Sequence, residues 1–312
     1  MARKNNSKFP LVDKATLIYM TILSLLILAF SANQKNWLIY IIFNFAVCAS
    51  IALVAGATNH SSNSWMKFFR HFSPLLFFIL LYEETRYLVH IIFPGFFDPL
   101  INHLELQVFS VYPTVWMQKF ISSALNEYLM FTYSFYYLLL LILGLGLFFK
   151  NKTEELDNLT FTSAVAFYIS FLGFILFPVE GPRYVLMNLH NLKLEGAFFT
   201  PLAQGLIKVA GIHGGAMPSS HVAVALVVLI YARRHHRLLY YILSLPILSL
   251  FVSTTYGRFH YVSDVVAGLL VGSVSILLCD KIIKRSQTKD RREIPQKDFS
   301  NASKVIRMDA YK

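Results

Sequence analysis

Two short segments of this 312-residue sequence each place a histidine beside groups suited to binding an anion. The first, M-P-S-S-H over residues 217–221, follows two glycines and precedes an apolar run. Proline is favoured in the first turn of a helix, because its missing N–H would have no partner there. We therefore expect the amides of Ser219, Ser220 and His221 at a helix start, where unpaired N–H groups bind phosphate oxygens. The Ser219 hydroxyl adds a donor, and His221 could protonate a leaving alkoxide. The same pattern also fits a serine-rich helix start with an interfacial histidine.

The second segment is H-Y-V-S-D over residues 260–264. The i, i+4 spacing puts Asp264 on the same helix face as His260. A carboxylate there can fix the imidazole tautomer and leave the other ring nitrogen as a nucleophile able to form a phosphohistidine. Arg258, two residues earlier, supplies a permanent cation for phosphate oxygens. A structural His–Asp pair is one alternative. A His/Asp metal site is another, but no third ligand has a fitting spacing and His213 is the best spare one, so we expect neither a metal nor another cofactor.

A third segment, G-P-R over residues 181–183, lies just beyond the end of an apolar run. A Gly-Pro turn there is rigid and would present the Arg183 guanidinium to the compartment that contains the two histidines. Taken alone, the segment fits a plain turn with an interfacial arginine better than a phosphate-binding site.

The elements that must position these residues are membrane-spanning helices. The chain is 56% hydrophobic and only 14% charged, and its apolar residues fall in blocks long enough to cross a bilayer. We count eight candidate spans, at about 14–31, 37–57, 73–93, 128–149, 159–178, 216–232, 238–256 and 262–280. The expected fold is an all-α polytopic membrane bundle. The first block could be mistaken for a signal peptide, but its apolar core is too long, and we expect an uncleaved span.

Charge predicts the orientation of this bundle. With a cytoplasmic N-terminus, 21 Lys and Arg residues fall on the inner side and 6 on the outer side, and Arg86 lies within a span. The positive-inside rule therefore places both termini in the cytoplasm. The net charge of +11 is a topology signal and does not indicate nucleic-acid binding. In this orientation Arg183, His221, His260 and Asp264 all face the outer side, whether periplasmic, extracellular or lumenal.

The sequence divides into three parts. Residues 1–127 hold three spans and an outer segment, 94–126, which we expect to form interfacial helices or a lid. Residues 128–281 contain all three motifs and a second long outer segment, 179–215, with an amphipathic stretch near 201–209. Residues 282–312 form a charged cytoplasmic tail that we expect to be loose or only partly helical. Cys48 and Cys279 lie inside apolar runs, so no disulfide framework is expected.

The three segments together resemble the type 2 phosphatidic acid phosphatase superfamily, whose motifs are K-x6-R-P, P-S-x-H and S-R-x5-H-x3-D. Pro218, Ser219 and His221 match the second motif, and His260 and Asp264 match the third. The departures lie in the remaining positions. The order at Arg183 is Pro-Arg, Leu176 occupies the lysine position, and Ser253 and Thr254 stand where Ser-Arg would fall. Forms such as G-P-R and Y-G-R-x-H-Y resemble the inositol phosphorylceramide synthase-like (aureobasidin-resistance-like) branch.

This resemblance implies a six-helix core in residues 128–281 and a division of roles. His260 attacks phosphorus, His221 protonates the leaving oxygen and Asp264 steadies His260. Ser219, Ser220 and the two arginines, Arg183 and Arg258, bind the phosphate. The expected activity is hydrolysis of a membrane lipid phosphate, either a monoester or a diphosphate. The sequence equally permits transfer of a phospho-headgroup to an acceptor alcohol. It does not define the oligomeric state.

Charged residues within the third span leave other functions open. Glu83, Arg86 and His90 share one helix face, and Glu84 lies beside them. Charges in a bilayer are costly and often functional. We favour a self-paired cluster packed against the core over an acceptor-headgroup site. A transporter with a histidine-based proton relay, and a purely structural membrane protein, are the remaining alternatives.

Overall fold

The computed structural model describes residues 9–58 and 63–293, and within these ranges the chain is almost entirely helical, without a named strand. The long helices are α1 (Leu11–Ala29), α2 (Trp37–Thr58), α3 (Ser64–Leu88), α6 (Ser123–Phe149), α7 (Thr153–Leu176), α10 (Ser220–His235), α11 (Arg237–Tyr256) and α12 (Val262–Glu293). The shorter ones are α4 (Asp98–Phe109), α5 (Pro113–Trp116), α8 (Pro182–Val185) and α9 (Phe199–Ala210).

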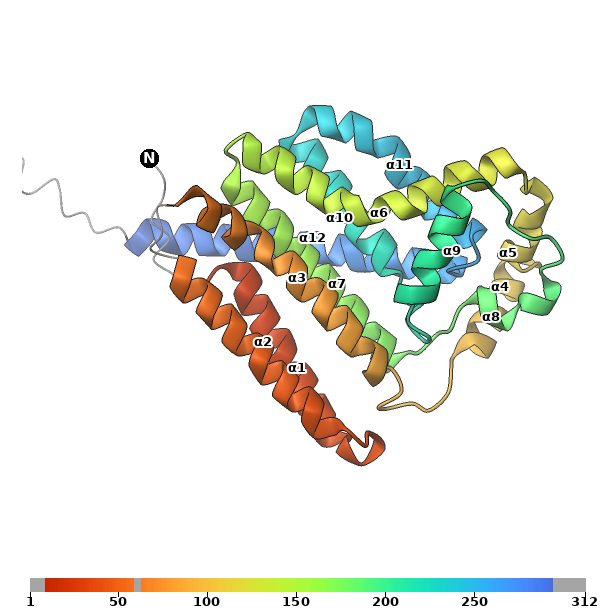
Figure 1. Ribbon diagram of the computed structural model, residues 1–312, viewed down its shortest axis with the longest axis horizontal. Helices are drawn as coiled ribbons and strands as arrows, with labels where there is room; N and C mark the ends of the chain where they lie inside the picture. The colour runs from red at the N-terminus through yellow and green to blue at the C-terminus, as the bar shows by residue number, and fades with distance from the viewer. Residues whose placement is uncertain (1–8, 59–62, 294–312) are drawn as a thin grey trace, which may run out of the picture.

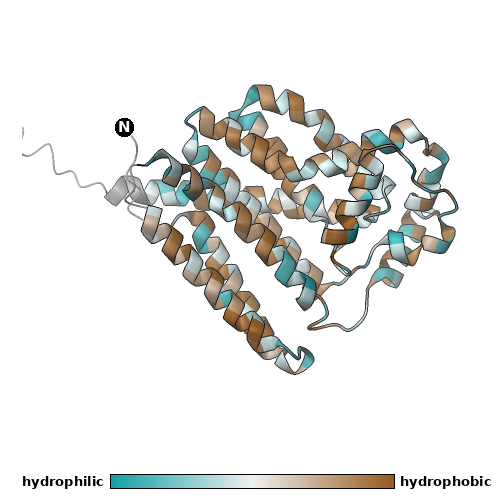
Figure 2. Cartoon of the chain, viewed as in Figure 1, coloured by the Kyte–Doolittle hydropathy of each residue, from teal (hydrophilic) through white to brown (hydrophobic). Residues whose placement is uncertain are grey.

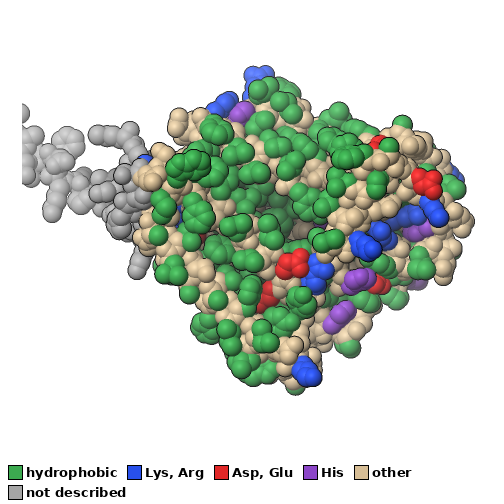
Figure 3. Space-filling view, in the orientation of Figure 1, with side chains coloured by type: hydrophobic (Ala, Val, Ile, Leu, Met, Phe, Trp, Pro, Cys, Tyr) green, Lys and Arg blue, Asp and Glu red, His purple; other side chains and the backbone are tan. Residues whose placement is uncertain are grey.

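Six of these helices, α1, α2, α6, α7, α11 and α12, are long and apolar enough to cross a membrane. Of the eight expected spans, α3 falls outside this group because charged residues lie in both of its halves, and α10 because it has only 16 residues. Both nevertheless pack lengthwise against α7 inside the bundle. Hydrophobic residues dominate the long helices (Figure 2), and apolar side chains cover much of the face seen in Figure 3. The chain is therefore an all-α polytopic membrane bundle, as the sequence predicts.

Helix α10 is the centre of the core segment. It packs against α6, α7, α11 and α12, and most of its small side chains, such as Ala223 and Ala225, are buried. Two glycines of α12 allow its backbone to lie close to that of α10. A methyl group at Gly268 would lie 2.5 Å from the Ser219 carbonyl oxygen, and one at Gly272 would lie 2.7 Å from that of Ala223. Small residues spaced four apart allow helix backbones to approach in this way.

The N-terminal helices α1–α3 form a second layer that packs on α7 (Figure 1). Tyr19 of α1 stacks on Tyr168 of α7 with ring centroids 4.5 Å apart, and Thr16 hydrogen-bonds the Tyr168 hydroxyl. The first apolar block is thus an integral part of the packed bundle.

The connecting segments α4, α5, α8 and α9 gather at one end of the bundle (Figure 1), where basic and histidine side chains also cluster (Figure 3). The segment 94–126 forms helices, and the amphipathic stretch near 201–209 is α9. At the other end, α12 continues past residue 281 to Glu293, so the beginning of the expected tail is helical. The rest of that tail, residues 294–312, lies outside the described residues.

Candidate active site

The structure brings the two motif histidines together. His221 lies in the first turn of α10, and His260 precedes the first turn of α12, at the same end of the bundle. Their ring centroids are 5.7 Å apart, and the ring planes are inclined by 62°. Because the close packing of Gly268 on Ser219 fixes the start of α10 against α12, this distance is set by helix packing.

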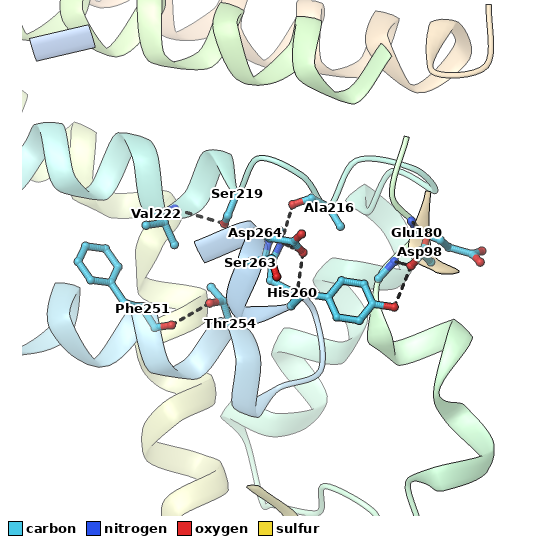
Figure 4. A network of polar contacts seen from close by, with 12 residues as sticks. Asp98, Glu180, Ala216, Ser219, Val222, Phe251, Thr254, His260, Ser263 and Asp264 are labelled. Atoms are coloured by element: carbon cyan, nitrogen blue, oxygen red, sulfur yellow. Dashed lines mark hydrogen bonds and ion pairs between the residues drawn. The ribbon is translucent and has the colours of Figure 1, made fainter. Parts of the chain in front are cut away.

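The tautomer of His260 follows from its partners. Its Nδ1 lies 2.8 Å from the Ala216 carbonyl oxygen, which can only accept, so Nδ1 is the donor. The Asp264 carboxylate is 3.4 Å from the same nitrogen and also accepts from the Tyr261 N–H at 2.8 Å (Figure 4). The expected His260–Asp264 pair is present, but the shorter bond is to the backbone. In this tautomer the unprotonated Nε2 has a free lone pair.

The His221 ring, in contrast, makes no hydrogen bond to another described residue. Both of its ring nitrogens are buried, and neither has a hydrogen-bond partner among the described residues. Aromatic side chains of α6 surround the ring, with Tyr133 at 5.1 Å and Tyr136 at 4.4 Å between centroids. The ring is therefore positioned by aromatic packing, and not by hydrogen bonds to other described residues.

The two predicted phosphate-binding arginines share one pocket. Arg183 and Arg258 both line a cavity of about 390 Å³, and Phe259 lies in its wall. The Arg183 guanidinium carbon is 5.8 Å from the Phe259 ring centroid, and that ring lies 4.4 Å from Tyr133, which stacks on His221. The arginine pocket is therefore connected to the imidazole pair through the Phe259 and Tyr133 rings.

The position where the third motif would place an arginine holds a threonine in this chain. Thr254 occupies the expected arginine position of the third motif, and its hydroxyl donates to the Phe251 carbonyl within its own helix. Arg258 adopts a left-handed backbone conformation, with φ of 64°, just after α11 ends. Its guanidinium donates to the Leu192 carbonyl, which ties the outer segment to the pocket.

The same pocket contains a neutral histidine. Burial, and to a smaller extent the positive charge of Arg258, lower the pKa of His190 to about 4. His190 lies 3.2 Å from the Thr114 hydroxyl. At neutral pH this side chain therefore contributes hydrogen-bonding groups to the pocket without a charge.

One expectation about the phosphate-binding amides is wrong. The Ser219 N–H donates to the Asp264 carbonyl oxygen at 3.0 Å, so it is not free to bind an anion. Ser219 instead caps α10, with its hydroxyl oxygen 3.5 Å from the Val222 nitrogen (Figure 4). The amides of Ser220 and His221 lie in the first helical turn, where N–H groups have no partner within the helix.

Hydrogen bonds to backbone groups join the three motif segments. Val179 donates to the Gly214 carbonyl at 3.2 Å and accepts from the Ala216 N–H at 2.9 Å. Ala216 in turn accepts from His260. Gly181 has φ of +105°, a conformation that glycine adopts without strain, and Arg183 follows this turn by two residues. His213, the spare metal ligand considered above, pairs with Glu180 at 2.9 Å.

The family relationship rests on a match that spans this whole arrangement. The family model described as the PAP2 superfamily matches residues 104–278, which is more than half of the chain. The chain belongs to the PAP2 superfamily. The searches of curated proteins and of solved structures found no match. Membership of the PAP2 superfamily indicates phosphatase or phosphotransferase activity, and the matched segment contains all of the predicted site residues.

Sequence reasoning missed several residues that build this PAP2 site. Asp98 and Glu105 of α4 accept hydrogen bonds from the motif segments. Glu127 caps α9 by accepting from the backbone N–H groups of residues 198–200. The i, i+7 spacing of Asp98 and Glu105 in a mostly apolar segment was an available signal, because it places both on one helix face.

The charged cluster of the third span is mainly self-paired. Arg86 forms two 3.0 Å hydrogen bonds with the Glu83 carboxylate and a third, of 3.1 Å, with the Val209 carbonyl. Glu84 is buried against Asn44 of α2, whose amide nitrogen can donate to it at 2.8 Å. His90 bonds to the Phe93 carbonyl and is not part of the cluster. Glu83 and Arg86 are thus paired with each other, as the favoured interpretation expects.

Proposed function

We propose that this protein is an integral membrane lipid phosphatase that hydrolyses a lipid-linked phosphate monoester or diphosphate through a phosphohistidine on His260, at the outer side of the membrane. The observation that supports this most strongly is the asymmetric imidazole pair. One ring is held by its Nδ1 with Nε2 unprotonated, and the other, 5.7 Å away, has both nitrogens unpaired. A nucleophile needs an unprotonated nitrogen, and a proton donor needs a ring nitrogen that is free to reach the leaving oxygen.

In the first step, Nε2 of His260 forms a bond to phosphorus while the bond from phosphorus to the lipid oxygen breaks. His221 gives its proton to that oxygen, and the lipid alcohol leaves. Positive charge on the His260 ring is stabilised by the Ala216 carbonyl and by Asp264, which lie 2.8 and 3.4 Å from its Nδ1. Arg183 and Arg258 balance the charge of the phosphate oxygens.

In the second step, His221 accepts a proton from water as the water oxygen bonds to phosphorus. The bond between phosphorus and Nε2 breaks, which releases phosphate and restores His260 with its original tautomer. The side chains named here supply positioning and charge stabilisation, and these effects account for most of the catalysis in phosphoryl transfer.

A second candidate is transfer of a phospho-headgroup to an acceptor alcohol, as in inositol phosphorylceramide synthases. The closed surroundings of the imidazole pair favour this possibility, since His260 is only 5% exposed and the His221 nitrogens are buried. A site that excludes water slows hydrolysis in favour of a bound alcohol. The polar pocket lined by His190, Lys193 and Gln204 offers hydrogen-bonding groups for such an acceptor.

The test is incubation of the purified protein with a panel of lipid phosphates and diphosphates, with and without candidate lipid alcohols. Free phosphate and transferred headgroup are measured in the same reaction. Release of phosphate that is abolished in His260→Ala supports the phosphatase. Product that forms only with an added alcohol supports the transferase. Wild-type turnover in His260→Ala would refute both.

A further inference from the structure

We propose that Asp98 and Glu105 of α4 are positioning residues that hold the segment of Arg183 in register with the segment of His260. Neither residue belongs to the three motifs. The proposal rests on the proposed function, because it assigns these carboxylates a role in the reaction that Arg183 and His260 perform.

Asp98 joins two motif segments directly. It is 1% exposed, and its Oδ2 accepts from the Glu180 N–H at 2.7 Å. Its Oδ1 accepts from the Gly181 N–H at 2.8 Å and from the Tyr261 hydroxyl at 3.0 Å (Figure 4). Gly181 is two residues from Arg183, and Tyr261 follows His260. One buried carboxylate thus connects the turn that holds the arginine to the residue beside the nucleophile.

Glu105 makes a corresponding connection two helical turns further along α4. Its Oε1 accepts from the Ser263 N–H at 2.8 Å and from the Ser263 hydroxyl at 2.9 Å. Ser263 immediately precedes Asp264 in the first turn of α12. The i, i+7 spacing puts Asp98 and Glu105 on the same face of α4, so a single helix contacts both the residue that follows His260 and the residue that precedes Asp264.

The contact is reinforced by backbone and apolar packing. The Phe97 N–H donates to the Pro178 carbonyl at 2.8 Å, just before the Gly-Pro-Arg turn. Ile101, on the same face of α4, belongs to a small buried cluster with Val179, Ala216 and Tyr261. The cluster contains one residue of each motif segment or its flank. Helix α4 therefore bridges the segment of Arg183 and the segment of His260.

Positioning of this kind is expected to matter for rate. A displacement of about 1 Å in a reacting group can cost on the order of 100-fold in rate. In Asp98→Asn, one of the carboxylate oxygens becomes an NH2 group, which must face a backbone N–H in either orientation. The turn at Gly181 can then move relative to His260, although the side chain has the same size.

The experiment compares Asp98→Asn in the wild type and in Arg183→Ala, with lipid phosphate turnover measured in each. We expect a loss of about 10- to 100-fold in kcat/KM in the wild-type background. In Arg183→Ala the same change should cost much less, because the group being positioned is already gone. Equal losses in the two backgrounds would indicate a merely structural role and overturn the proposal. Asp157→Asn, at the opposite end of the bundle beside His71, is the matched control and should leave activity unchanged.

Tyr261→Phe tests the same link without changing a charge. It removes only the hydroxyl that donates to Asp98, and we expect a loss of about 2- to 10-fold that does not add to the loss in Asp98→Asn. Additive losses, or no loss in either variant, would contradict the proposal.

Binding of orthovanadate, a phosphate analogue, provides a readout without turnover. We expect Asp98→Asn to weaken vanadate binding about tenfold or more. Suppose that the wild type turns over lipid phosphate and that Asp98→Asn has the same rate and the same affinity for vanadate. That result would overturn this inference and leave the proposed function standing. A wild type that neither releases phosphate nor binds vanadate would overturn the proposed function, and this inference with it.

Discussion

At the scale of single residues, the two histidines differ in their hydrogen bonding, and this difference underlies their proposed roles. His260 is fixed by an acceptor-only carbonyl and a carboxylate, which leaves Nε2 as the basic nitrogen. His221 has no such partner and is stacked among tyrosines. The Asp264 side chain is fully buried, so a charge on His260 would be compensated within the protein interior.

This assignment predicts how His221→Ala depends on the leaving group. Loss of a general acid typically costs about 100- to 10,000-fold when the leaving oxygen needs a proton, as a lipid alcohol does. A nitrophenyl phosphate has a leaving group that needs no proton. We therefore expect His221→Ala to release nitrophenol in a rapid burst close to the amount of enzyme, followed by slow turnover, as measured by stopped-flow absorbance.

Two controls make this result specific. His260→Ala should show no burst with the same substrate, and His90→Ala, outside the site, should behave as wild type. If His221→Ala slows the burst as much as it slows the later turnover, His221 has a role other than proton donor.

At the scale of elements, the site depends on how closely α12 approaches α10. The contact is made at Gly268, one helical turn beyond Asp264, against the Ser219 carbonyl. Ser219 also donates its N–H to Asp264. The second and third motifs are thus joined by backbone contacts next to both histidines.

Gly268→Ala should consequently impair catalysis although it touches no substrate. The added methyl group would lie 2.5 Å from the Ser219 carbonyl oxygen, which forces the helices apart. Overpacking of this kind costs about 1–3 kcal/mol in stability. We expect a lower thermal midpoint in detergent and at least a tenfold loss of activity. Gly56→Ala in α2, where nothing lies within 4 Å, is the matched control. Equal activity in both variants would contradict this account.

The long elements could be predicted from the sequence because their signal is local. Blocks of apolar residues predicted α1, α2, α6, α7, α11 and α12. The position of Pro218 predicted the helix start at Ser219, and the His260–Asp264 spacing predicted the one near His260. The shorter membrane-embedded helix α10 was also expected, although by its own length it does not span a bilayer.

The contacts between distant segments could not be predicted in this way. The carboxylate of Asp98 reaches Glu180 and Tyr261, more than 80 residues away in the chain, and no local pattern identifies such partners. The Ser219 amide was expected to be free because helix starts leave N–H groups unpaired, but the Asp264 carbonyl occupies it. The closest partner of His260 is a backbone carbonyl, and every residue has one.

At the scale of the whole molecule, the ends of α10 and α12 that hold the histidines lie with α4, α8 and α9, away from the basic turn at Arg233–Arg237 (Figure 1). The distribution of Lys and Arg predicts that the histidine end faces the outer compartment. Substrate would then reach the site from the outer leaflet.

Cysteine labelling tests this orientation. Asn191→Cys lies on the exposed outer segment and Lys150→Cys at the opposite end of the bundle. In sealed vesicles of known orientation, we expect a membrane-impermeant thiol reagent to label Asn191→Cys from the outer side and Lys150→Cys only after permeabilisation. The parent chain, whose Cys48 and Cys279 lie within helices, is the background control. The reverse pattern would place the site in the cytoplasm.

The covalent intermediate is the central claim, and it can be measured directly. The wild-type protein is mixed with a lipid phosphate radiolabelled at phosphorus and quenched in alkali, which preserves phosphohistidine, before proteolysis and mass spectrometry. We predict label on the peptide that contains His260, lost in His260→Ala. Steady release of phosphate with no label on His260, or with label on another residue, would contradict the mechanism.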